Sequence, residues 1–391
     1  MDWIIFLHVF TIVNKCLLFP LFWFKKNNSV ANRLLALLIL LPAVPVFSNF
    51  VIYTGKLQSF PHLLYIYQIL INLFGPVYYF YCMTMVGQPF KFSKDKLLHL
   101  LPSILPLYFW LDFLMLSKQE QIDFVTHFLN AGHLTWKMEL VSITPSIIAF
   151  PYMIVAAWKV YQRTYSAKNV FANLKTLKIS YIREFIHITV FEILVLIGLH
   201  FLVPLKHIEI IWVPILGNVM YFYVIYKSYN YSIIFSEKDY EEYQKRFIPL
   251  NEYVSQSSVS KYAGSTLSEQ KLEDYVRQLN NGFKVEKWHL DPELNLKTLS
   301  QKSNIPTHCI SQTINQKFEK NFFDYVNSYR VKSLKQKLLE PKYQHFKLEE
   351  LAYMCGFNSK AAFQRAFKKH VGMTPTEYRN LKTDIPEAVN Y

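Results

Sequence analysis

Five polar side chains near the C-terminus have the types and the spacing needed to contact DNA. Lys360, Gln364, Arg365, Lys368 and Lys369 lie one, three or four positions apart, so a helix would carry them on one outer face. Arginine can donate two hydrogen bonds to guanine and glutamine can pair with adenine, whereas lysine can neutralise a phosphate. This set of residues therefore favours a nucleic-acid contact over catalysis.

Two short helices and one tight turn must hold these side chains in place. The apolar stripe of the first helix consists of Leu348, Leu351, Ala352 and Cys355, and that of the second of Phe363, Ala366, Phe367 and His370. Gly356 suits the left-handed conformation that ends a helix, and Ser359 can cap the helix that follows. Together these features predict a DNA-reading helix-turn-helix.

The same pattern occurs a second time, earlier in the chain. Residues 296–305 precede their counterparts in 348–357 by 52 positions, and after the turn the offset becomes 53. Asn304 stands where the later unit has a glycine, and asparagine is the next-best residue for that conformation. Between the units, residues 322–339 predict one helix, stopped by Pro341, of roughly 27 Å. That length would hold two reading helices near one DNA turn, about 34 Å, apart.

Residues 283–381 resemble the DNA-binding domain of the AraC/XylS family of transcription regulators. The matching residues are Gly356-Phe357-Asn358-Ser359, Phe363, Phe367-Lys368-Lys369, Gly372, Thr374-Pro375, Tyr378-Arg379 and 327–331. Residues 31–38, 261–265 and 290–294 are similar to the membrane-attached branch of that family. The first unit departs from the pattern at Pro306-Thr307, where a capping serine is usual, and Ser333 replaces a usual alanine.

The resemblance implies roles for individual residues. The first recognition helix would present His308, Ser311 and Gln312 to one major groove, and the second would present Lys360, Ala361, Gln364 and Arg365 to the next. Lys368 and Lys369 would contact phosphates, which position the protein without reading sequence. The expected partner is double-stranded promoter or operator DNA. A net charge of +8 over residues 283–380, from 17 Lys and Arg against 9 Asp and Glu, fits a polyanionic partner.

The N-terminal 235 residues read as membrane. Over the whole chain 52% of residues are hydrophobic and 18% charged, and the long apolar runs all precede residue 236. Seven runs approach the length of about 20 residues that crosses a bilayer: 3–24, 30–53, 62–86, 97–116, 138–160, 184–205 and 208–235. The run 97–116 is the weakest, because Pro102, Pro106 and Asp112 interrupt it, and a count different by one span is the alternative. A soluble protein with seven buried helices is a further alternative.

Charges in the connecting loops predict the orientation. The first, third and fifth loops hold twelve Lys and Arg residues, and the second, fourth and sixth hold four. By the positive-inside rule the N-terminus lies outside and the C-terminus inside. This orientation puts the predicted DNA reader in the cytoplasm and the chain in the cytoplasmic (inner) membrane. Residues 1–24 read as a retained span rather than a signal peptide, because Lys25 and Lys26 follow the apolar run and no small-residue cleavage site closes it.

Two charged residues lie within the predicted spans. Lys15 and Glu192 are each roughly 12–14 Å from the cytoplasmic boundary, at 1.5 Å per helical residue. Charge inside a membrane is unfavourable and is usually paired or functional. Equal depth permits an intramembrane ion pair, and the alternative is that each side chain separately faces a polar interior.

We therefore expect an all-α protein in four parts: a seven-helix transmembrane bundle (1–235), a juxtamembrane linker (236–282), a double helix-turn-helix domain (283–382) and a tail (383–391). The linker should contain one helix, opened by a capping box at Thr266–Glu269 and ended near Gly282, whose apolar stripe either forms a homodimer or packs on the next domain. An unknown signal ligand would act on the membrane part.

An enzyme is not expected. The sequence has no GxG phosphate loop and no HExxH motif, and no pair of its four cysteines has metal-ligand spacing, so we expect neither cofactor nor metal. The competing function is a membrane receptor or transporter whose helix-turn-helix domain mainly recruits partners.

Overall fold

The computed structural model describes residues 2–131, 136–174, 177–202, 211–231, 235–260 and 267–383. As expected, these residues form an all-α protein, with isolated β-bridges but no strand among them. The chain divides into two compact units. The N-terminal unit comprises residues 1–161 and 178–245, and the C-terminal unit comprises residues 162–177 and 246–391.

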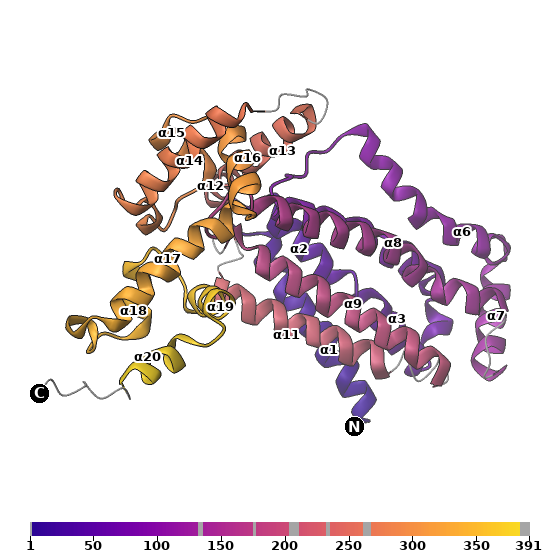
Figure 1. The fold of residues 1–391 in the computed structure, drawn as a ribbon. Helices are drawn as coiled ribbons and strands as arrows, with labels where there is room; N and C mark the ends of the chain where they lie inside the picture. Colours follow the sequence, from indigo (N-terminus) through magenta and orange to yellow (C-terminus); the bar gives the residue numbers. More distant parts are fainter. Residues whose placement is uncertain are drawn as a thin grey trace, which may run out of the picture. The chain divides into compact units, whose positions relative to one another are not determined.

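The N-terminal unit is built from long apolar helices joined by short connections (Figure 1). Its helices are α1 (Trp3–Trp23), α2 (Val30–Leu40), α3 (Ala43–Tyr53), η1 (Leu57–Ser59), α4 (Leu63–Ile71), α5 (Phe74–Met85), η2 (Lys94–Leu100), α6 (Leu101–Leu114), α7 (Lys118–Ala131), α8 (Trp136–Ala167), α9 (Ile179–Leu202), α11 (Val213–Tyr231) and α12 (Glu237–Lys245). The last six residues of α8 belong to the C-terminal unit. α1 packs against α2, α3 and α11, and α11 also packs against α9.

Three described helices are long and apolar enough to cross a membrane: Trp3–Trp23, Val30–Tyr53 and Ile143–Ala167. The candidate span Val30–Tyr53 consists of α2 and α3, which are separated at Leu41 and Pro42. The span expected over 62–86 is divided into α4 and α5 just before Gly75-Pro76. Proline removes a backbone donor and favours such breaks. Helix α7 lies where a loop was expected, and α8 continues seven residues beyond the expected end at 160. Residues 203–205 of the sixth run, and residues 208–210 and 232–234 of the seventh, lie outside the described residues.

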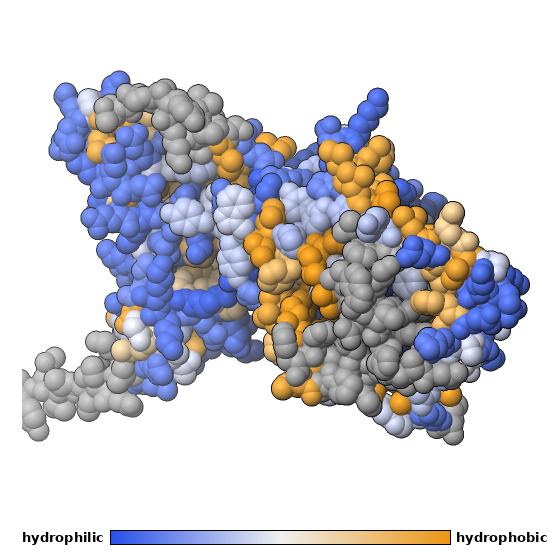
Figure 2. All heavy atoms as spheres, turned by 90° about the vertical axis from the view of Figure 1, so that its right-hand side faces the viewer, coloured by the Kyte–Doolittle hydropathy of each residue, from blue (hydrophilic) through white to orange (hydrophobic). Residues whose placement is uncertain are grey.

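Helix α1 has the reverse of the pattern found on a helix of a water-soluble protein. Its buried face includes the polar residues His8, Thr11 and Lys15. Its opposite face is apolar, with Phe6 59% exposed and Leu17 64% exposed. Large hydrophobic side chains are also exposed on α8 and α9, and hydrophobic residues form broad areas of the surface in Figure 2. Soluble monomers rarely expose continuous apolar patches of this kind.

The C-terminal unit consists of α13 (Ile248–Ser260), α14 (Glu269–Lys284), η5 (Trp288–Leu290), α15 (Leu296–Ser303), α16 (Thr307–Phe318), α17 (Phe322–Leu339), η6 (Pro341–Tyr343), α18 (Leu348–Met354), α19 (Lys360–Val371) and α20 (Pro375–Thr383). α17 has the bounds that the sequence predicts. α14 begins directly after Ser268, whose side chain makes no capping hydrogen bond, and it continues to Lys284, beyond Gly282. The expected cap Thr266 lies outside the described residues. The apolar stripe of α14 packs on α15 and α16 of the same chain.

The chain between α8 and α9 is part of the C-terminal unit, although the sequence placed it among the cytoplasmic loops of the membrane part. Phe171 forms an antiparallel bridge with Asn295, in which Ala172 N donates to Leu294 O (3.2 Å) and Leu296 N donates to Val170 O (2.7 Å). In addition, Phe323 N at the start of α17 donates to Lys168 O (2.8 Å). Val170, Phe171 and Ala172 are three consecutive apolar residues in an otherwise polar loop, and all three are buried. This apolar run is the feature of the sequence that indicates that the loop packs against other parts of the chain.

Candidate nucleic-acid interface

The later helix-turn-helix consists of α18, the five-residue turn 355–359 and α19. Gly356 has φ +85° in the turn, and Ser359 Oγ accepts a hydrogen bond from Ala362 N (3.3 Å), as the sequence predicts. The two helices close over one hydrophobic cluster made of Val331, Leu334 and Leu338 of α17, Leu351 and Ala352 of α18, Cys355 and Phe357 of the turn, and Phe363, Ala366 and Phe367 of α19. This cluster fixes α19 and leaves its other face in solvent.

The predicted DNA-contacting side chains lie on that exposed face of α19. Lys360, Ala361, Gln364, Arg365, Lys368 and Lys369 are all exposed. Lys360 pairs with Glu349 of α18 (2.6 Å), and Lys369 pairs with Asp324 at the start of α17 (2.7 Å). These exposed ion pairs are weak, so a phosphate can replace either carboxylate.

The earlier helix-turn-helix consists of α15, a short turn and α16. Asn295 caps α15, accepting hydrogen bonds from Lys297 N and Thr298 N (both 3.0 Å), and Asn304 in the turn has the left-handed φ of +52° that the repeat predicts. On α16, His308 is exposed and Gln312 is half-buried. Ser311, predicted as a base reader, is only 7% exposed.

Helix α13 is what covers Ser311. It packs on α16, and the hydroxyls of Tyr253 and Ser311 are 3.4 Å apart. Glu252 of α13 also pairs with Lys297 of α15 (3.2 Å), and Asn251 Oδ1 accepts a hydrogen bond from Arg163 Nη2 (2.5 Å). The structure therefore does not show the three predicted readers of α16 on one open face. The reason is tertiary: a linker helix that the sequence did not assign lies over this part of the recognition helix.

One buried arginine connects α17 to the segment 289–291 and to residue 172. The Arg330 side chain on α17 is 1% exposed and donates to three backbone carbonyls: Nε to His289 O (2.9 Å), Nη2 to Asp291 O (2.7 Å) and Nη1 to Ala172 O (3.3 Å). Burial lowers the pKa of Arg330 to about 10, so the group is still charged at neutral pH. Arg330 belongs to the motif 327–331 that resembles the family. That motif does not predict the contact of Arg330 with residue 172.

Burial also sets the protonation state of His289 beside this arginine. Desolvation lowers its pKa to about 4, so the ring is neutral at pH 7, where its Nε2 lies 2.7 Å from Ser333 Oγ. The serine that departs from the family pattern therefore makes a hydrogen bond. Burial raises the pKa of the Cys355 thiol to about 11, which keeps it un-ionised in the core. Within the described ranges, no three His, Cys, Asp or Glu residues form a group suited to a metal ion.

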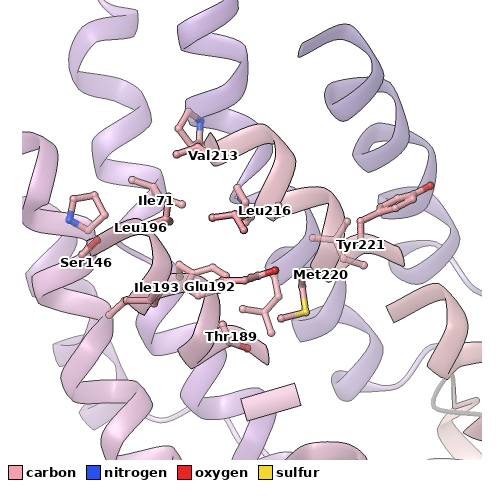
Figure 3. A pocket seen from close by; sticks show the side chains of 18 of the residues that line it. Ile71, Ser146, Thr189, Glu192, Ile193, Leu196, Val213, Leu216, Met220 and Tyr221 are labelled. Atoms are coloured by element: carbon pink, nitrogen blue, oxygen red, sulfur yellow. The ribbon is translucent and has the colours of Figure 1, made fainter. Parts of the chain in front are cut away.

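The two intramembrane candidates, Lys15 and Glu192, lie in the N-terminal unit and line the same cavity. Glu192 is labelled in Figure 3. No direct ion pair between Lys15 and Glu192 is found within the described part of the chain, so the predicted pair remains a prediction.

Comparison with known proteins identifies a helix-turn-helix domain in the C-terminal part of the sequence. Residues 299–381 match a family of helix-turn-helix domains of the AraC type, as found in DNA-binding transcription regulators. The chain is also similar to a solved protein of unknown function from Listeria innocua, with 29% identity over 30% of this chain and 98% of that one, at a TM-score of 0.23. No curated protein matches the chain.

Proposed function

We propose that the protein is a membrane-embedded, one-component transcription regulator. In this proposal the N-terminal unit crosses the cytoplasmic membrane seven times and senses a signal, and the C-terminal unit binds promoter DNA in the cytoplasm. The activity is binding rather than catalysis.

The observation that carries the DNA-binding half is the exposed polar face of α19. Six side chains with the chemistry for bases and phosphates lie on one face, while the opposite face is anchored in the core. Gln364 and Arg365 suit base edges, and Lys368 suits a phosphate. The 18 residues of α17 would keep α16 and α19 roughly 27 Å apart along its axis, close to one DNA turn.

Binding-site selection with the full chain in nanodiscs tests this half. Arg365→Ala should lose about 1–3 kcal/mol of discrimination at one base pair. Lys368→Ala should weaken binding to all sequences evenly and lower the salt slope by about one. An unchanged preferred motif for Arg365→Ala would reject that residue as a base reader. No sequence preference in the wild-type chain would favour the alternative, a membrane receptor or transporter whose helix-turn-helix domain recruits partners.

The reversed polarity of α1 and the loop charges support the membrane half. Buried polar and exposed apolar faces are favourable when lipid, not water, surrounds the helix. Reporter fusions after residues 28, 92 and 170 should be cytoplasmic, and fusions after 57 and 125 external. Cytoplasmic signal from both of the latter would rule out the seven-span topology.

The contacts of residues 162–177 suggest how a signal could reach the DNA-binding unit. This segment connects α8 to α9, and its backbone pairs with residues 294–296, just before and at the start of α15. Through Arg163 it also contacts α13, which covers Ser311. A displacement of α8 or α9 would therefore act on the position of α13 and on the exposure of the first recognition helix.

A further inference from the structure

A cavity of about 630 Å³ lies among the helices of the N-terminal unit. Side chains from α1, α2, α3, α4, α5, α8, α9 and α11 line it (Figure 3). Its volume is in the range of about 300–1,000 Å³ that is usual for small-molecule sites in proteins. The walls are mostly aliphatic and aromatic, so the body of any occupant must be apolar.

Two ionisable groups interrupt the apolar wall. Lys15 is 3% exposed, and Gly217 opposite it provides the space for its head, because a Cβ at Gly217 would lie 2.9 Å from Lys15 Nζ. Glu192 extends toward the α11 residues Leu216 and Met220 (Figure 3). Its Oε1 atom is buried and receives no hydrogen bond from the described residues. A buried polar atom without a partner is unfavourable, and a ligand can supply the missing donor.

The arrangement selects the charge of the ligand. Lys15 and Glu192 together carry no net charge, whether both are ionised or both are neutral. In an apolar site, an anionic head would be repelled by Glu192 and a cationic head by Lys15. A head that accepts from Lys15 and donates to Glu192 satisfies both groups.

We propose that this cavity binds a lipophilic molecule whose compact head has no net charge and carries both a hydrogen-bond acceptor and a donor, as in an amide, an alcohol or a zwitterion. The site lies within the N-terminal unit, and the proposal rests on the proposed function only in placing that unit in a membrane. DNA binding and its test are independent of it.

Photolabelling of the full chain in nanodiscs tests the proposal with three diazirine probes of equal chain length. These are an N-acylethanolamine, which is neutral, a fatty acid, which is anionic, and an alkylamine, which is cationic. We expect the neutral probe to label cavity residues of α9 and α11, saturably, and at least several-fold more than the charged probes. Unlabelled competitors distinguish the source of the ligand. Loss of labelling with lipids of the native membrane would indicate a bilayer lipid, whereas loss only with unlabelled N-acylethanolamine would indicate a diffusible ligand.

Charge variants sharpen the test. Glu192→Gln leaves a lone cation and should shift preference to the fatty acid, whereas Lys15→Met leaves a lone carboxylate and should shift it to the alkylamine. The wild-type labelling is decisive even if a variant does not fold. Labelling confined to lipid-facing residues such as Phe6 and Leu17, without saturation and equal for all probes, would overturn the proposal. Folded variants with unchanged probe preference would overturn the assigned roles of Lys15 and Glu192.

Discussion

Replacement of Gly356 by alanine should destabilise the later helix-turn-helix far more than the same change at Gly372. Both glycines have left-handed backbone, with φ +85° and +86°. A Cβ at Gly356 would lie 2.3 Å from His289 O and 2.9 Å from Leu290 O, whereas a Cβ at Gly372 would meet nothing within 4 Å. Gly372→Ala is therefore a matched control that has the backbone strain without the steric clash.

The expected magnitudes follow from these contacts. A left-handed alanine costs about 1–2 kcal/mol relative to its favoured conformation. The clash adds about 1–3 kcal/mol, the usual range for overpacking, because both contacted oxygens belong to the backbone and His289 O is held by Arg330 Nε (2.9 Å). Gly356→Ala should then cost about 2–5 kcal/mol in total, against about 1–2 kcal/mol for the control.

Hydrogen exchange measured by mass spectrometry on the full chain in detergent reports this difference directly. Amides of α18 and of residues 286–292 should exchange roughly 5- to 150-fold faster in Gly356→Ala than in Gly372→Ala, because each 1.4 kcal/mol is tenfold in the opening equilibrium. Equal exchange in the two variants would refute the argument that the turn is packed tightly against the 289–290 backbone.

Three further results are expected. Tyr253→Ala should uncover Ser311 and raise DNA affinity several-fold, while Tyr253→Phe keeps the covering ring and should not; a gel-shift titration that gives equal affinities would contradict the covering role. Arg330→Met should cost at least about 3 kcal/mol, measured by exchange of α17 amides, because three buried carbonyls lose a charged donor. His289 has a folded-state pKa of about 4, below its unfolded value near 6.5, so stability is complete above pH 6.5 and is lost as pH falls toward 4. His289→Gln should flatten that part of a stability-against-pH curve, and an unchanged slope would exclude this histidine as its cause.

Local sequence determined much of the C-terminal unit. The stripes of α18 and α19, the turn glycine, the cap at Ser359 and the left-handed Asn304 all appear in the structure as their spacing predicts. These features depend on residues within a few positions of one another, where helical periodicity, capping and φ preferences act. Repetition of the pattern was sufficient to predict the earlier unit, and the helical run that Pro341 stops predicted the bounds of α17.

Tertiary structure alone decided how these elements are covered and joined. The burial of Ser311 depends on α13, whose Tyr253 lies 58 positions earlier in the chain. The three acceptors of Arg330 include Ala172, 158 positions away. Lys15 and Glu192 face one cavity because α1, α9 and α11 pack around it. Sequence periodicity specifies which face of a helix is buried, but not which distant segment buries it, because that choice depends on the packing of the whole unit.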